Sequence, residues 1–93
     1  MISAEVIKGV QDLLEGRGIE QRPQEKFGDY AARGLGISAR QAEVLLDSLH
    51  DGDTIEEAVR KADIDSASVS EDMLFQVARA IGSAMGRAAA RKK

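Results

Sequence analysis

The sequence predicts an all-α fold, a compact array of about five helices. Apolar residues recur at helical spacing in five segments, and each segment is bounded by capping residues or by glycines. No segment alternates apolar and polar residues for long enough to predict a strand. Because the chain has one tyrosine, two phenylalanines and no tryptophan, its core must consist mainly of Leu, Ile, Val and Ala, which favours packed helices over a sheet.

The first helix is predicted over residues 4–15. One face of this segment is apolar at helical spacing and consists of Val6, Ile7, Val10, Leu13 and Leu14. Gly16 is expected to end the helix in the left-handed conformation. A loop over residues 16–24, which contains the only proline, then leads to a short second helix over residues 24–33.

Two glycines, Gly34 and Gly36, are expected to break the chain sharply after the second helix. Ser38 is the predicted N-cap of a third helix over residues 39–50. The apolar stripe of this helix consists of Ala42, Leu45, Leu46 and Leu49.

A capping box of Thr54 and Glu57 opens a fourth helix over residues 55–62. A polar turn follows, and the fifth and longest helix is predicted over residues 71–89. The apolar stripe of the fifth helix consists of Leu74, Val77, Ala78, Ile81, Ala84 and Met85.

The length predicts a single helical domain over residues 1–93, in which residues 90–93 form a frayed basic tail. Charge is distributed unevenly along this domain. Residues 46–75 carry two basic and nine acidic side chains, net −7, whereas residues 76–93 carry five basic side chains and no acidic one, net +5. Such blocks predict either self-complementary packing or an oriented electrostatic surface.

Composition and spacing argue against several classes of chemistry. The absence of cysteine excludes disulfides, thiolate zinc sites and cysteine nucleophiles. His50, the only histidine, lies near a predicted helix end, and no serine stands at motif spacing with it and an acid. The acidic segment 63–74 lacks the glycine and glutamate spacing of a calcium loop. We therefore predict a non-enzymatic chain with no metal site, no cofactor and no small-molecule substrate.

The sequence also predicts where the protein acts. Its first residues lack the basic start and apolar run of a signal peptide. No stretch approaches the roughly 18 apolar residues of a membrane span. These features predict a cytoplasmic protein that makes no contact with a membrane.

Residues 29–49 have the spacing of a helix-turn-helix. The segment contains, in this order, a small residue, an apolar residue, a turn glycine, an apolar anchor and two inward-facing helix positions. They are Ala32, Leu35, Gly36, Ile37, Ala42 and Leu45. The segment resembles the helix-turn-helix of bacterial and phage DNA-binding proteins. Residues 37–64 resemble phage small terminase subunits, which usually carry glycine at the position of Asp63.

The resemblance implies that the helix over residues 39–50 would enter the major groove of duplex DNA with its N-terminal end. Ser38, Arg40 and Gln41 would then face the bases, where arginine pairs with guanine and glutamine with adenine. Arg33 would lie near a phosphate. On this hypothesis the chain is a small DNA-binding or regulatory protein.

The charge pattern supports a different hypothesis, a helical protein–protein interaction module, either a homodimer or an adaptor, with no nucleic-acid role. Glu43 and Asp47 on the third helix, together with the acidic block, would repel phosphates. The last helix contains small residues and ends in a basic tail, which consists of Arg87, Arg91, Lys92 and Lys93. This tail is a candidate contact for nucleic acid or for the acidic fourth helix of a second copy.

Overall fold

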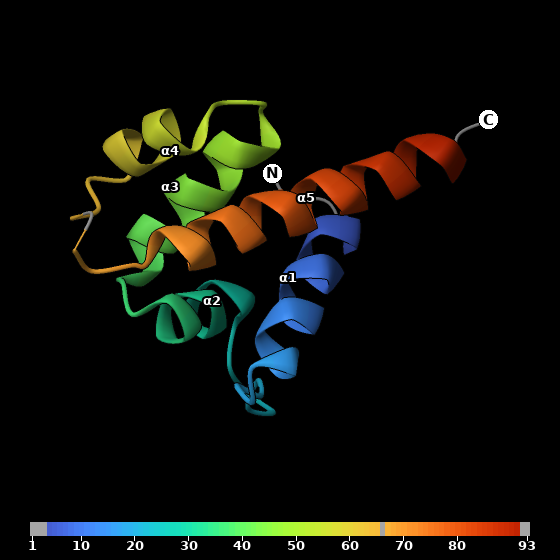
Figure 1. Ribbon diagram of the computed structural model, residues 1–93. Helices are drawn as coiled ribbons and strands as arrows, with labels where there is room; N and C mark the ends of the chain where they lie inside the picture. Colours follow the sequence, from blue (N-terminus) through green and yellow to red (C-terminus); the bar gives the residue numbers. More distant parts are fainter. Residues whose placement is uncertain (1–3, 66, 92–93) are drawn as a thin grey trace.

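The described part of the chain is helical. The computed structural model describes residues 4–65 and 67–91, with side chains up to residue 86, and over these residues there are five helices and no strand (Figure 1). The helices are α1 (Ala4–Gly16), α2 (Phe27–Leu35), α3 (Ala39–His50), α4 (Ile55–Lys61) and α5 (Glu71–Arg91). The predicted all-α array is confirmed. No helix in this part of the chain has the length and apolar character needed to cross a membrane.

The start of α2 differs from the prediction: the helix begins at Phe27 and not at residue 24. A turn precedes it, because the Glu25 N–H donates to the Arg22 carbonyl (3.0 Å) and the Glu25 carboxylate accepts from the Arg22 N–H (3.1 Å). Lys26 then takes the extended N-cap conformation, and its carbonyl accepts from the Tyr30 N–H. The predicted boundary was wrong because hydrogen bonds of Glu25 stabilise a turn in place of a first helical turn.

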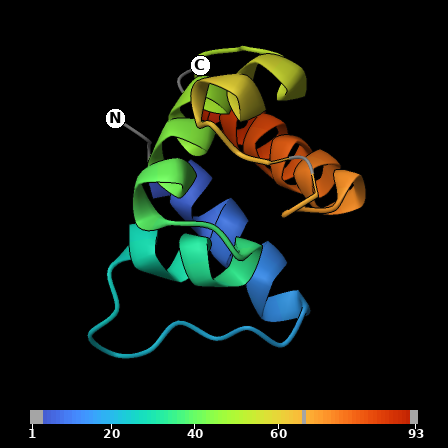
Figure 2. The ribbon, with the colours of Figure 1, turned by 90° about the vertical axis from the view of Figure 1, so that its left-hand side faces the viewer.

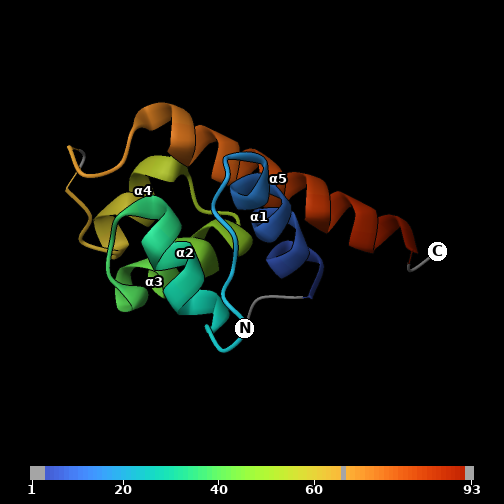
Figure 3. The same ribbon diagram turned by 90° about the horizontal axis from the view of Figure 1, so that it is seen from below.

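The core lies where α5 packs against the other helices. α5 crosses and packs against α1 and also contacts α3 and α4, while α2 packs on α3 (Figures 1 and 3). Gly9 brings α1 close to α5, because a Cβ atom at this position would lie only 3.2 Å from the Ala80 carbonyl oxygen. The largest fully buried side chains come from α1, α2, α3 and α5 and are Val6, Val10, Leu14, Tyr30, Leu45, Leu46, Val77 and Ile81.

The end of α1 uses a later glycine than predicted. Gly16 is the last helical residue, and Gly18 is the left-handed residue, with φ of 82°. The Leu14 carbonyl accepts from the N–H groups of Arg17 and Ile19, which closes the helix end. The later glycine is selected because it turns Ile19 back onto the core, where this side chain packs half-buried.

The break after α2 requires one of the two predicted glycines. Gly36 has φ of 74°, and the N–H groups of Gly36 and Ile37 both donate to the Ala32 carbonyl, at 2.8 and 3.0 Å. Gly34 stays in the helix and serves packing, because a Cβ atom there would lie 2.8 Å from Cδ2 of Leu14. The expectation that Gly34 helps to break the chain was therefore wrong.

Asp63 lies two residues after the end of α4 and is the only non-glycine residue with positive φ (55°) in the described segments. The Ile64 N–H donates to the Val59 carbonyl (3.1 Å), as at a glycine-terminated helix end.

A left-handed aspartate is strained where glycine is not. We expect Asp63→Gly to raise the free energy of unfolding by about 0.5–1 kcal/mol, measured by urea denaturation. Gly36→Ala, the reverse change at a left-handed position, should lower it by about 1 kcal/mol, and a destabilised Asp63→Gly would contradict the prediction.

Candidate interaction surfaces

The corner between α2 and α3 is compact and ordered by hydrogen bonds. Four of the six residues that suggested a helix-turn-helix are buried, namely Ala32, Leu35, Ala42 and Leu45. Ile37 packs half-buried against the same core, and Gly36 provides the left-handed turn. As a result, α3 starts directly beside the turn (Figure 2), where Ser38 and Arg40 are exposed and Ala39 packs half-buried against the core.

Ser38 and Gln41 are used to hold this corner together. The Ser38 hydroxyl accepts from the Gln41 N–H (3.1 Å), and the Gln41 side-chain oxygen accepts from the Ser38 N–H (2.9 Å), which forms a capping box. The Gln41 side-chain amide also donates to the Asp63 carbonyl (2.9 Å), so it ties the start of α3 to the end of α4. A bidentate contact from Gln41 to adenine would require both of these bonds to break.

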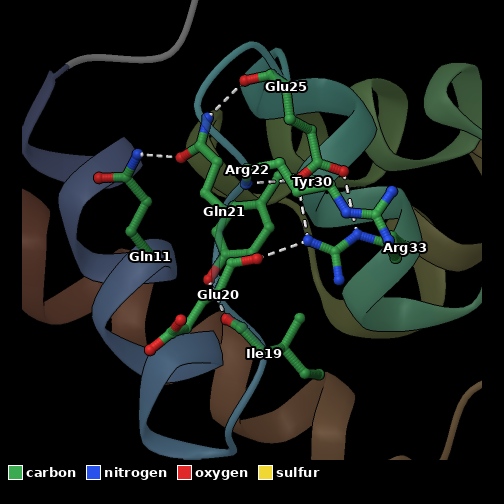
Figure 4. A network of polar contacts seen from close by, with 8 residues as sticks. All are labelled: Gln11, Ile19, Glu20, Gln21, Arg22, Glu25, Tyr30 and Arg33. Carbon is green, nitrogen blue, oxygen red and sulfur yellow. Dashed lines mark hydrogen bonds and ion pairs between the residues drawn. The ribbon is translucent and has the colours of Figure 1, made fainter.

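Arg33 is likewise engaged within the chain (Figure 4). Its guanidinium donates to both carboxylate oxygens of Glu25, at 3.0 and 2.8 Å, and to the Glu20 carbonyl at 2.6 Å. It also lies 5.7 Å from the ring centroid of Tyr30. Arg33 therefore holds the loop between α1 and α2 against α2, a structural role that sequence spacing did not reveal.

The Glu25–Arg33 ion pair leads to a prediction about pH. The hydrogen bond from Arg33 holds the pKa of Glu25 at about 2, below its ordinary value of 4.5. The pair therefore contributes fully to stability above pH 4.5, and this contribution is lost as the pH falls toward 2. We expect the wild-type chain to lose more stability across this range than the Glu25→Gln variant, measured by urea unfolding at several pH values. Parallel pH profiles for the two proteins would contradict this expectation.

Arg40 is exposed and, unlike Arg33, makes no ion pair with the described residues. It borders a hollow of about 580 Å³ between the start of α3 and the end of α4. The hollow is lined by Ser38, Arg40, Gln41, Val44, Lys61, Ala62 and Asp63. Lys61 is paired with Asp53 at 2.6 Å, so its charge is largely compensated.

The outward side of α3 carries mixed charge. Glu43 and Asp47 are exposed and stand three and seven residues beyond Arg40, which places them on the same side of the helix. The side of α3 that would approach DNA thus carries one cation and two carboxylates. Of the four candidate DNA contacts, Arg40 is the only cation whose charge is free to meet a phosphate or a base.

A second surface surrounds Phe75, whose side chain is 58% exposed. Phe75 stands between two hollows, one of about 530 Å³ beside α1 and one of about 500 Å³ beside α4. Together they define what we call the Phe75 surface. The hollow beside α4 is lined by Ile55, Glu56, Glu71, Asp72, Leu74 and Phe75 and carries only acidic charge, whereas the hollow beside α1 is lined by Leu13, Asp72, Phe75, Gln76, Arg79, Ala80 and Ser83 and includes one cation, Arg79. The sequence pattern did not lead us to predict this surface. A signal was present, because Phe75 is a large apolar residue that falls outside the predicted apolar stripe of α5.

The C-terminal part of α5 also departs from its predicted pattern. Met85, assigned to the apolar stripe, is 37% exposed, because α5 extends beyond the body of the molecule (Figures 1 and 3). α5 continues to Arg91, past the predicted end at residue 89. Of the predicted basic tail, Arg87 and Arg91 lie in α5 with side chains outside the described part, and Lys92 and Lys93 lie outside the described residues.

No cluster of three or more acidic or histidine side chains able to hold a metal ion occurs among the described residues. The hollow beside Arg40 and the Phe75 surface are the candidate interaction surfaces of the described residues. Comparison with known proteins gives no match to a family model, to a curated protein or to a solved structure.

Proposed function

We propose that the chain is a non-enzymatic helical protein-interaction module, which uses the Phe75 surface to bind a basic helical segment of a partner protein. The observation that carries this proposal is the exposure of Phe75 between two hollows. Aromatic side chains bury a large area at little entropic cost and are frequent anchors of protein interfaces. In a chain with so few aromatic residues, leaving one exposed beside apolar Leu13 and Ile55 favours a binding role.

Charge supports the choice of a basic partner. Glu56, Glu71 and Asp72 line the hollow between Phe75 and α4. Asp72 forms an ion pair with Arg17, in which Nη2 of the arginine lies 3.2 Å from Oδ2 of the aspartate. The two glutamates are left to meet an incoming cation. Complementary charges at the rim of an interface increase the association rate and reject partners of the wrong sign.

The test uses a fluorescein-labelled, alanine-rich helical peptide that carries lysines, with binding followed by fluorescence anisotropy. We expect Phe75→Ala to weaken binding about 30-fold, the effect of losing a central aromatic anchor. Met85→Ala truncates the other exposed large apolar side chain of α5 and should change the affinity less than about twofold. A peptide with glutamate in place of lysine should not bind. Absence of binding by the lysine peptide would contradict the proposal.

Duplex DNA is a second candidate partner, favoured by the exposed Arg40 beside the turn that precedes α3. In this case Arg40 would contact a base or a phosphate at the leading end of α3. We expect Arg40→Ala to weaken binding of a labelled duplex at low salt about tenfold, whereas Arg60→Ala, an exposed arginine on α4, should have little effect. No binding by the wild-type chain at low salt would exclude this candidate.

A further inference from the structure

We infer that the basic helical segment bound at the Phe75 surface is α5 of a second copy of this chain, in an antiparallel, two-fold symmetric pair. This inference rests on the proposed function and names its partner. The chain carries both halves of the interface: an exposed aromatic residue with acidic neighbours near the start of α5, and a basic segment at its end.

The outward side of α5 has the spacing of a helix–helix seam. Phe75, Arg79, Gly82 and Gly86 are exposed and follow one another at intervals of four, three and four residues, which is the heptad spacing of paired helices. A Cβ atom built at Gly82 or Gly86 would meet no other atom within 4 Å, so the helix surface is open there. A neighbouring helix can therefore approach this side closely, and α5 extends past the other helices where it would do so (Figures 1 and 3).

The antiparallel arrangement places large residues opposite small ones. With the two-fold axis between residues 80 and 81, Phe75 of one copy packs on Gly86 of the other. Arg79 then lies over Gly82, where its aliphatic stem packs and its guanidinium reaches solvent. Because the same contacts occur twice about the axis, the pair is closed and does not propagate into a filament.

Charge selects the same direction. In an antiparallel pair, Glu71 and Asp72 of one copy lie opposite the end of α5 of the other, which runs to Arg91 and contains Arg87 and Arg91 but no acidic residue. A parallel pair would place these basic segments side by side, and like charges at that spacing repel. The end of the acidic block over residues 46–75 and the basic block over residues 76–93 thus become neighbours across the interface.

Sedimentation equilibrium of the full chain tests this inference. At a chain concentration of about 100 μM we expect monomer and dimer in equilibrium, and we expect the fraction of dimer to fall as salt is added. Gly86→Gln should raise the dissociation constant of the dimer at least tenfold, because its side chain fills the space that Phe75 of the other copy occupies. Gly86→Ala should change the dissociation constant less than about threefold. Both variants should keep the helical circular dichroism of the parent, because the site is open in the monomer.

A crosslink provides an independent check of the register. The sequence contains no cysteine, so a single introduced thiol reports on one position. Gly82→Cys lies next to the proposed axis and should form a disulfide-linked dimer on mild oxidation, whereas Glu43→Cys, exposed on α3, should not.

The outcomes separate this inference from the proposed function. A chain that stays monomeric at about 1 mM but binds the lysine peptide overturns the inference and leaves the proposed function intact. A dimer that resists both Gly86→Gln and Phe75→Ala overturns the inference, since self-association then uses another surface. A dimer weakened by both substitutions and crosslinked through Gly82→Cys supports it.

Discussion

Replacement of Leu14 by alanine is expected to lower the free energy of unfolding by about 3–4 kcal/mol. Leu14 is fully buried in α1, and its methyl groups lie against Gly34 of α2. Truncation removes apolar contacts and leaves a cavity, and the cost of a cavity depends on how well the surrounding side chains can fill it. Here one wall is a glycine, which has no side chain that could move into the space. Thermal and urea unfolding would both report the loss.

A double-mutant cycle isolates the contact between Leu14 and Gly34. Gly34→Ala alone should destabilise the chain, because its Cβ would lie 2.8 Å from Cδ2 of Leu14. In the Leu14→Ala background the same methyl group enters the cavity, so the double variant should be more stable than the sum of the single effects predicts, by about 1 kcal/mol or more. If the changes in the free energy of unfolding of the two single variants simply added up in the double variant, the two residues would not determine each other's packing.

Tyr30→Ala is expected to lower the free energy of unfolding by about 3–5 kcal/mol. The side chain is fully buried on α2, and its hydroxyl donates to the Ile19 carbonyl in the loop that follows α1 (Figure 4). Burial raises the pKa of Tyr30, so the hydroxyl stays protonated and remains a donor. The substitution removes a large ring from the core and also releases the loop.

Tyr30→Phe separates these two contributions. It keeps the ring but leaves the Ile19 carbonyl without its donor, and we expect a loss of about 1 kcal/mol. Urea unfolding of the two variants side by side measures the difference. If Tyr30→Phe were as damaging as Tyr30→Ala, the hydroxyl bond and not the ring would dominate, contrary to our expectation.

The positions of the helices were predictable because local signals and burial agree. The capping box of Thr54 and Glu57 is formed as predicted, and the apolar positions of α3 are buried. One error occurs where a side chain distant in sequence decides the outcome, because only the packed Leu14 reveals the role of Gly34. The other is local: the start of α2 shifted because Glu25 bonds to the backbone of Arg22, three residues before it.

The candidate sites were less predictable for a related reason. The spacing of Ser38 and Gln41 is that of a capping box, so the structural use of Gln41 had a sequence signal. The pairing of Arg33 with Glu25 joins a helix to a loop, at a spacing that no helical rule describes. The Phe75 surface combines residues from α1, α4 and α5, and only the packing of these helices brings them together.

The packing of α1 on α5 has a consequence for how the protein is made. During synthesis α1 leaves the ribosome before α5, the helix that packs against it at Gly9. Until then the part of α1 around Gly9 is uncovered and open to chaperones or to aggregation, although Leu14 can already pack on α2. Ribosome-bound chains that stop before Ala80 should therefore be digested rapidly by protease, and resistance should arise only once α5 has emerged.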